Sequence, residues 1–137
     1  MKSLKFVIPW LCFLLGDQAI IASEGSYQCV ISEQMLLNKD GTLKRPPIPY
    51  LIGQRFAVDR NTGQIVGPGY EPWQSRDGKI TVLAHGNADN SFVVVSVSPA
   101  AKTGVHITLL RVNEYTEGKS KPFVVQSGGT VISGVCE

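Results

Sequence analysis

Short segments of alternating polar and apolar residues, separated by Gly, Asn, Asp and Pro, run through the chain from residue 27 to its end. In the first segment, large apolar residues fall on alternate positions, with one interruption at Glu33: Tyr27, Cys29, Ile31, Met35 and Leu37. A period of two is typical of a half-buried β-strand. No stretch keeps a helical period for three turns, so the pattern favours a β structure.

Turn chemistry divides the rest of the chain in the same way. Asn38–Gly41 predicts one turn, and Arg60–Gly63 predicts a hairpin connection, with Asp59 before it and Gly63 at a position that needs positive φ. We expect further strands at Arg55–Asp59, Gln64–Gly67, Lys79–His85, Ser91–Ser98, Val105–Tyr115 and Pro122–Cys136, the last broken at Gly128–Gly129. The sequence therefore predicts an all-β fold, a single antiparallel barrel or sandwich of roughly six to eight strands.

The first residues have the features of a secretory signal peptide. Lys2 and Lys5 form a basic start, the apolar run Phe6–Gly16 follows, and Asp17 ends it. The run is shorter than the roughly 20 residues that cross a bilayer, so we expect cleavage rather than a membrane anchor. We place the signal peptide at residues 1–22 and one domain at 23–137, with Ser23–Gly25 as an alternative cleavage site.

Only two cysteines follow this leader: Cys29, shortly after the leader ends, and Cys136, near the end of the chain. In an oxidising compartment two such thiols are expected to pair. The predicted disulfide ties the first strand to the last. Two thiols without matching ligands are a poor metal site, and we expect neither a metal nor a cofactor.

The charge balance excludes some partners. Removing Lys2, Lys5 and Asp17 with the leader from 13 basic and 11 acidic residues leaves about eleven against ten. Nucleic-acid binding normally needs a clustered basic surface, and membrane-surface binding needs a polybasic run or a basic amphipathic helix. We therefore expect no nucleic-acid partner and no membrane anchor after cleavage.

The segment Asp59–Gly63 begins like a calcium-binding loop, with oxygen ligands close together. The loop needs a glycine at its sixth position and a glutamate at its twelfth, where the chain has Gln64 and Tyr70. The favoured interpretation is a turn in which the Asp59 carboxylate accepts backbone N–H groups.

Two histidines are available for catalysis. His85 ends a predicted strand, where a carboxylate from Asp59 or Asp89 is a candidate partner. His106 alternates with Val105, Ile107 and Leu109, which predicts that it lies on the opposite, solvated face of its strand. We expect neither histidine to be catalytic, because no motif accompanies them and an exposed or hydrogen-bonded side chain explains both.

The segment Gly67–Trp73 carries two large amphipathic side chains, Tyr70 and Trp73, among Gly and Pro residues. Such rings serve as recognition anchors when they are exposed on a loop. They can equally fold back as a lid over an open barrel end, with Trp73 buried while its N–H stays in water, and we favour this lid over the recognition anchor. If the domain binds a partner, Tyr70 and Trp73 are the predicted binding residues.

Three segments together resemble a group of small exported bacterial β-proteins, of proteobacterial type and uncharacterised function: Phe56–Gly63, Lys121–Val124 and Ser133–Glu137. The likeness covers most of the chain after the leader. It implies a bacterial, secreted or periplasmic location, and it implies no activity, cofactor or catalytic residue.

Two functions remain open from the sequence. The first is a non-enzymatic binding or interaction domain of the bacterial envelope, whose partner is another envelope protein or a small ligand. The second is a small envelope hydrolase that uses His85 with Asp59 or Asp89. A pocket that brings these groups within hydrogen-bond distance would favour the hydrolase.

Overall fold

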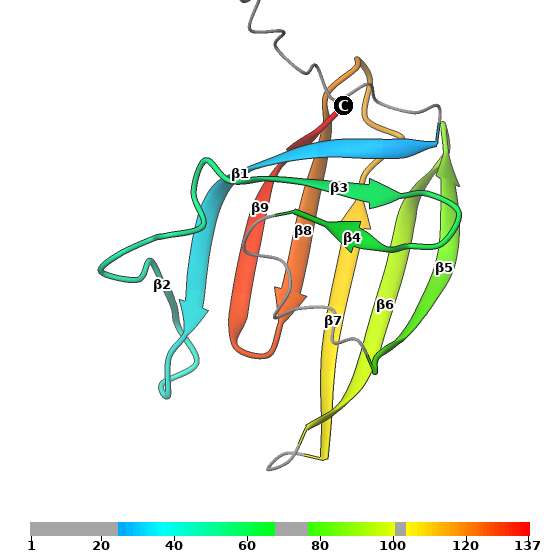
Figure 1. Cartoon of the computed structure of the whole chain (residues 1–137). Coiled ribbons are helices and arrows are strands. Elements are labelled where there is room, and N and C mark those ends of the chain that lie inside the picture. The colour runs from blue at the N-terminus through cyan, green and yellow to red at the C-terminus, as the bar shows by residue number, and fades with distance from the viewer. Residues whose placement is uncertain (1–24, 68–76, 101–103) are drawn as a thin grey trace, which may run out of the picture.

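The computed structural model describes residues 25–67, 77–100 and 104–137. These residues form strands and turns only (Figure 1). The strands are β1 (Ser26–Leu37), β2 (Leu43–Lys44), β3 (Arg55–Asp59), β4 (Ile65–Val66), β5 (Lys79–Asn87), β6 (Asn90–Ala100), β7 (Gly104–Val112), β8 (Lys121–Ser127) and β9 (Thr130–Cys136). Over these ranges there is no helix of the length and apolar character that a membrane span requires. The predicted signal peptide, residues 1–22, lies outside the described residues.

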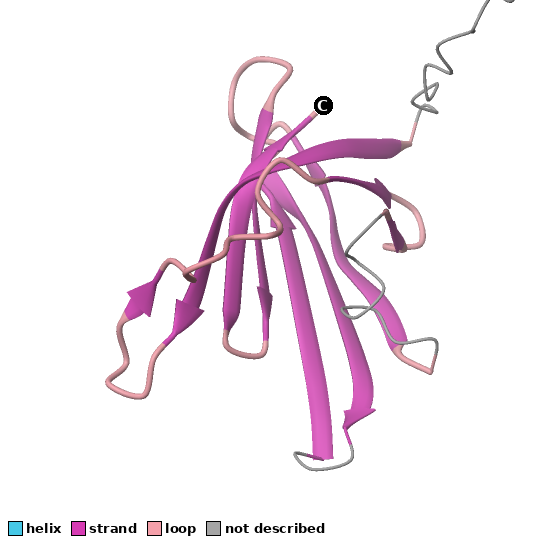
Figure 2. Ribbon diagram, turned by 60° about the vertical axis from the view of Figure 1, so that its left-hand side comes forward, coloured by secondary structure: helices cyan, strands magenta, loops and turns pink. Residues whose placement is uncertain are grey.

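All the strands belong to one antiparallel sheet in the order β4-β3-β1-β9-β8-β7-β6-β5, and β2 pairs with the end of β1. From β5 to β9 each strand pairs with the next one in the chain. The last strand, β9, then pairs with the first, β1. The sheet curls into a half-barrel (Figures 1 and 2), so of the two predicted architectures the barrel-like one is present.

β1 bends at a β-bulge between Ile31 and Glu33, where its register against β9 shifts. The strand first crosses the end of the half-barrel and then turns to run along one side of it (Figure 1). Before the bulge it pairs with β3, and after it with β2. Gly134 of β9 allows the close approach at this point, because a Cβ there would lie 2.0 Å from the Val30 carbonyl oxygen.

The core lies on the inner face of the curled sheet and includes residues from β1, β3, β6, β7, β8 and β9. The turn between β3 and β4 packs onto β5 and β6 at Gly63. A Cβ at Gly63 would meet the side chains of Val94, Ile80 and Val82 at 2.3, 3.1 and 3.2 Å. The β3–β4 hairpin therefore covers the inner face of β5 and β6.

The disulfide between Cys29 and Cys136 is present, as the sequence predicted. The two residues are direct partners across β1 and β9, with their Cα atoms 3.9 Å apart. Both side chains are buried. The bridge thus joins the first and last strands within the core.

The predicted orientation of His106 is wrong. His106 shares the inner face of β7 with the buried residues Thr108 and Leu110, whereas Val105 and Ile107 are 52% and 54% exposed. A period of two separates the two faces of a strand but does not say which face is buried. Near this end of β6, β7 and β8 the inner face carries hydroxyl groups, from Ser96, Ser98, Thr108 and Ser127.

Candidate functional site

A pocket of about 410 Å³ opens at the end of the half-barrel that β1 crosses. It is built where several separate segments end: the start of β1, the turn after β3, the β5–β6 turn, the β7–β8 loop and the residue after β9. Its lining consists of Ser26, Tyr27, Arg60, Asn87, Ala88, Glu114, Lys119, Lys121 and Glu137. We call this hollow the end pocket.

The turn after β3 places Arg60 in the end pocket. One carboxylate oxygen of Asp59 accepts the backbone N–H groups of Asn61 and Thr62, both at 2.8 Å. These bonds hold the pKa of Asp59 below its ordinary value. The Arg60 N–H donates to the carbonyl of Gly25. The predicted turn is confirmed, and over residues 25–67, 77–100 and 104–137 no cluster of three or more metal-ligand side chains occurs.

The β5–β6 turn forms a second wall. The Asn87 side-chain oxygen accepts the N–H groups of Asp89 and Asn90 at 2.8 and 3.1 Å, which fixes the tight turn. Just before it, Gly86 has a φ of +72°, and a Cβ there would lie 2.9 Å from the carboxyl carbon of Glu114. Glycine at this position leaves the room that the Glu114 carboxylate occupies.

An ion pair between Arg60 and Glu114 crosses the end pocket, with 2.5 Å between a terminal guanidinium nitrogen and a carboxylate oxygen. The Glu114 side chain is only 11% exposed, against 38% for Arg60. Burial raises the pKa of Glu114, and the charge of Lys121 acts in the opposite direction.

Tyr27 forms the floor beneath Arg60. The centre of the guanidinium lies 5.0 Å from the centroid of the Tyr27 ring, within range of a cation–π contact. The Tyr27 ring also packs against the ring of Phe92 in a tilted arrangement, with 5.3 Å between the two centroids. The Tyr27 hydroxyl is buried, and within the described part of the chain it has no hydrogen-bond partner. An unpartnered buried hydroxyl costs about 1–3 kcal/mol, so a group that reached it would gain a strong contact.

The remaining polar groups surround this centre. The Lys121 ammonium donates to the Thr116 carbonyl, and the Ser120 hydroxyl donates to a carboxylate oxygen of Glu137 at 3.2 Å. Lys119 is exposed on the same loop. The lining thus carries three cations and two carboxylates, and both carboxylates already have a partner.

Among the described residues, the side chains proposed for a hydrolase are not hydrogen-bonded to one another. His85 is exposed on β5, and Asp59 is engaged by its own turn. Asp89 lines another depression, on the outer face of the sheet, with Arg111 and Tyr115. Across the described ranges His85 has no hydrogen bond to either carboxylate. Tyr70 and Trp73, the predicted binding residues, lie outside the described residues.

A second polar cluster lies near the β8–β9 turn, at the other end of the strands from the end pocket (Figure 1). The Ser127 hydroxyl lies 2.9 Å from Nε2 of His106 and 2.9 Å from the Thr108 hydroxyl. No carboxylate among the described residues is hydrogen-bonded to His106, so this serine–histidine pair lacks an acid to orient its base. The cluster satisfies buried polar groups on the inner face.

The end pocket was not predicted from the sequence. Arg60 was predicted only as a turn residue, and Glu114 only as part of the strand Val105–Tyr115. Lys121 entered only through the segment Lys121–Val124 that carries the resemblance. No local motif joins them, because they meet only through the pairing of distant strands.

The chain matches no protein-family model, no curated protein and no solved structure. Function has to be inferred from the geometry of the chain itself.

Proposed function

We propose that this chain is an exported, non-enzymatic binding domain of the bacterial envelope, and that it holds a small ligand in the end pocket. The observation that carries the proposal is the centre of that pocket: an Arg60–Glu114 ion pair set over Tyr27, whose buried hydroxyl is unpartnered among the described residues. The volume of the end pocket, about 410 Å³, falls within the range of small-molecule sites.

Two features support export to a secreted or periplasmic location. Residues 1–22 follow the order of a signal peptide, with a basic start, an apolar run and a polar end. The disulfide between Cys29 and Cys136 suits an oxidising compartment, where such bonds form and persist.

The composition of the end pocket favours binding over catalysis. Among the described residues its lining holds no histidine and no cysteine. Arg60 and Glu114 pair with each other, Lys121 donates to a backbone carbonyl, and Glu137 accepts from the Ser120 hydroxyl. A hydrolase would need a nucleophile, a base and an orienting group within hydrogen-bond distance of each other. Among the described residues no hydrogen bond joins His85 to Asp59, whose carboxylate accepts from its own turn, so the hydrolase has no supporting observation.

Solution NMR of the protein purified after export tests the proposal. Inorganic phosphate, ethylammonium and methyl glucoside are added separately, at constant pH and ionic strength. We expect at least one probe to shift the amide signals of Arg60, Asn87 and Glu114 in a saturable way, while the signals of Lys44 on β2 stay in place. If none of the three probes produces a saturable shift at the pocket, the proposal is wrong.

A further inference from the structure

We infer that the ligand of the end pocket is a small anion, a carboxylate or a phosphate, held by Arg60, Lys119 and Lys121. This inference rests on the proposed function, since it names the class of ligand for the same pocket.

The hydrogen-bonding capacity left in the pocket points to an anion. Glu114 is taken by Arg60, and one oxygen of Glu137 is taken by Ser120. A cationic ligand would therefore have to compete for carboxylates that already have partners. An anion, in contrast, meets the Lys119 ammonium, which has no partner among the described residues, beside the guanidinium of Arg60 and the ammonium of Lys121.

Arg60 is the principal anchor. A guanidinium has five N–H donors in a planar fork, and Glu114 contacts one of its terminal nitrogens. The face of the fork is fixed by the Tyr27 ring at 5.0 Å, so its position is set before a ligand arrives. A planar, pre-oriented fork suits the oxygens of a carboxylate or a phosphate.

The Tyr27 hydroxyl supplies a second observation. It belongs to a side chain that is only 5% exposed, lines the same pocket and is unpartnered within the described ranges. A phenolic O–H donates to an anionic oxygen and gains strength from its charge. The geometry thus places a fixed guanidinium and two ammonium groups around one space, with the Tyr27 ring beneath the guanidinium.

Glu114 acts as a built-in competitor in this arrangement. Its carboxylate lies on Arg60, where it lowers the local positive potential that a ligand meets. Glutamine at this position keeps the shape and a hydrogen-bond acceptor but removes the charge. Loss of one negative charge beside the site should tighten anion binding by about three- to tenfold.

Titration of the protein purified after export, with phosphate and separately with acetate, tests the inference. Both anions are expected to shift the amide signals of Arg60, Asn87 and Lys121 more than sodium chloride does at equal ionic strength. The anion that binds more tightly shows whether the pocket prefers a phosphate or a carboxylate. Lys119→Gln should weaken binding at least about threefold, and Arg60→Gln more. Lys119 is exposed, so its variant reports on binding even if the Arg60 variant folds poorly.

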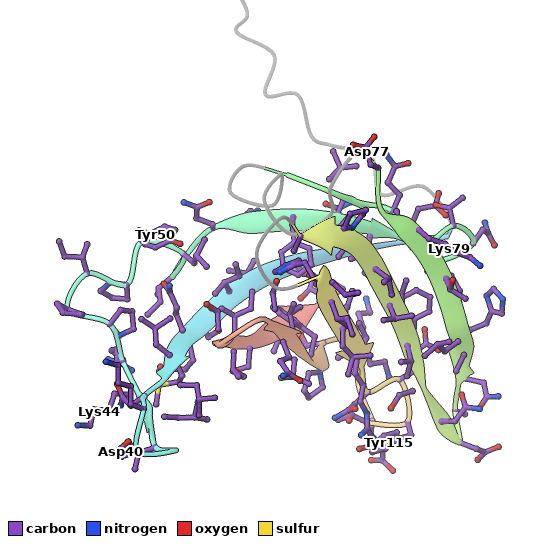
Figure 3. The ribbon with its side chains drawn as sticks, turned by 90° about the horizontal axis from the view of Figure 1, so that it is seen from below. Asp40, Lys44, Tyr50, Asp77, Lys79 and Tyr115 are labelled. Carbon is purple, nitrogen blue, oxygen red and sulfur yellow. A yellow bond between two sulfur atoms is a disulfide. The ribbon has the colours of Figure 1, made fainter. Side chains whose placement is uncertain are left out.

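Matched controls come from a second ion pair among the described residues, Arg45–Glu33, which is exposed and lies beside β2. Glu33→Gln and Lys44→Gln carry the same charge changes as Glu114→Gln and Lys119→Gln, and should leave anion affinity unchanged. Figure 3 places Lys44 at the β2 end of the sheet. Equal effects at the control sites would mean non-specific charge attraction and would overturn the inference.

The outcomes also separate the two proposals. Saturable binding of ethylammonium or methyl glucoside at the pocket, without binding of phosphate or acetate, leaves the binding domain in place and overturns the anion. Absence of saturable binding by every probe overturns both.

Discussion

Replacement of Gly63 by alanine should be one of the most destabilising single-methyl changes in the protein. The residue has a φ of +74°, and a Cβ there would lie 2.3 Å from a methyl carbon of Val94. Carbon atoms normally pack at about 3.5–4.0 Å, so atoms must move. Val94 is 1% exposed in β6 and has little freedom to give way. The left-handed backbone costs about 1–2 kcal/mol and overpacking typically about 1–3 kcal/mol, together about 2–5 kcal/mol.

Gly41→Ala is the matched control. Gly41 also has a positive φ, +82°, but a Cβ there would meet nothing within 4 Å. It should therefore cost only the backbone part, about 1–2 kcal/mol. Urea unfolding followed by circular dichroism measures both variants. Equal losses would refute the view that the β3–β4 hairpin packs on β5 and β6 at this point.

Three further predictions follow from the same features. In oxidising buffer, the double variant Cys29→Ala, Cys136→Ala should have a free energy of unfolding about 4–5 kcal/mol lower than the disulfide-bonded wild type, because the bridge spans 107 residues. Compared with wild type whose disulfide has been reduced, the variant should lose much less. Burial raises the pKa of Glu114 in the folded protein above the ordinary value of 4.5, so the free energy of unfolding should fall as the pH rises above 4.5. Thermal melts at a series of pH values measure this fall. An equal fall in the Glu114→Gln variant would contradict the prediction. Intact mass of the exported protein should show loss of residues 1–22, give or take about three, and retention of Met1 would exclude cleavage.

The strands were predictable because alternation and turn chemistry agree along most of the chain. Arg55–Asp59 is confirmed to the residue as β3, since Asp59 binds the backbone of the following turn and Gly63 takes a positive φ. The predicted break at Gly128–Gly129 falls between β8 and β9. Turn residues act within a few positions of themselves, so the sequence displays them directly.

The inner face was harder to predict because the two faces of β7 do not differ as expected. Val105 and Ile107 are exposed, while His106 and Thr108 face inward and bond to Ser127. A prediction from hydrophobicity alone therefore buries the wrong face of β7 near its start. Three polar side chains can lie inside when they satisfy one another, and the pattern of β7 alone does not reveal that Ser127, on the neighbouring strand β8, carries the matching hydroxyl.

The end pocket shows how an irregularity in the sequence pattern becomes a property of the site. Alternation in the first segment breaks at Glu33, and the structure has its β-bulge there, between Ile31 and Glu33. The bulge bends β1, so that the part before it leaves the side of the half-barrel, crosses the end and pairs with β3 (Figure 1). Tyr27 lies on that part, beneath Arg60. A regular β1 would continue straight on, and the ring that holds the guanidinium would not reach the pocket.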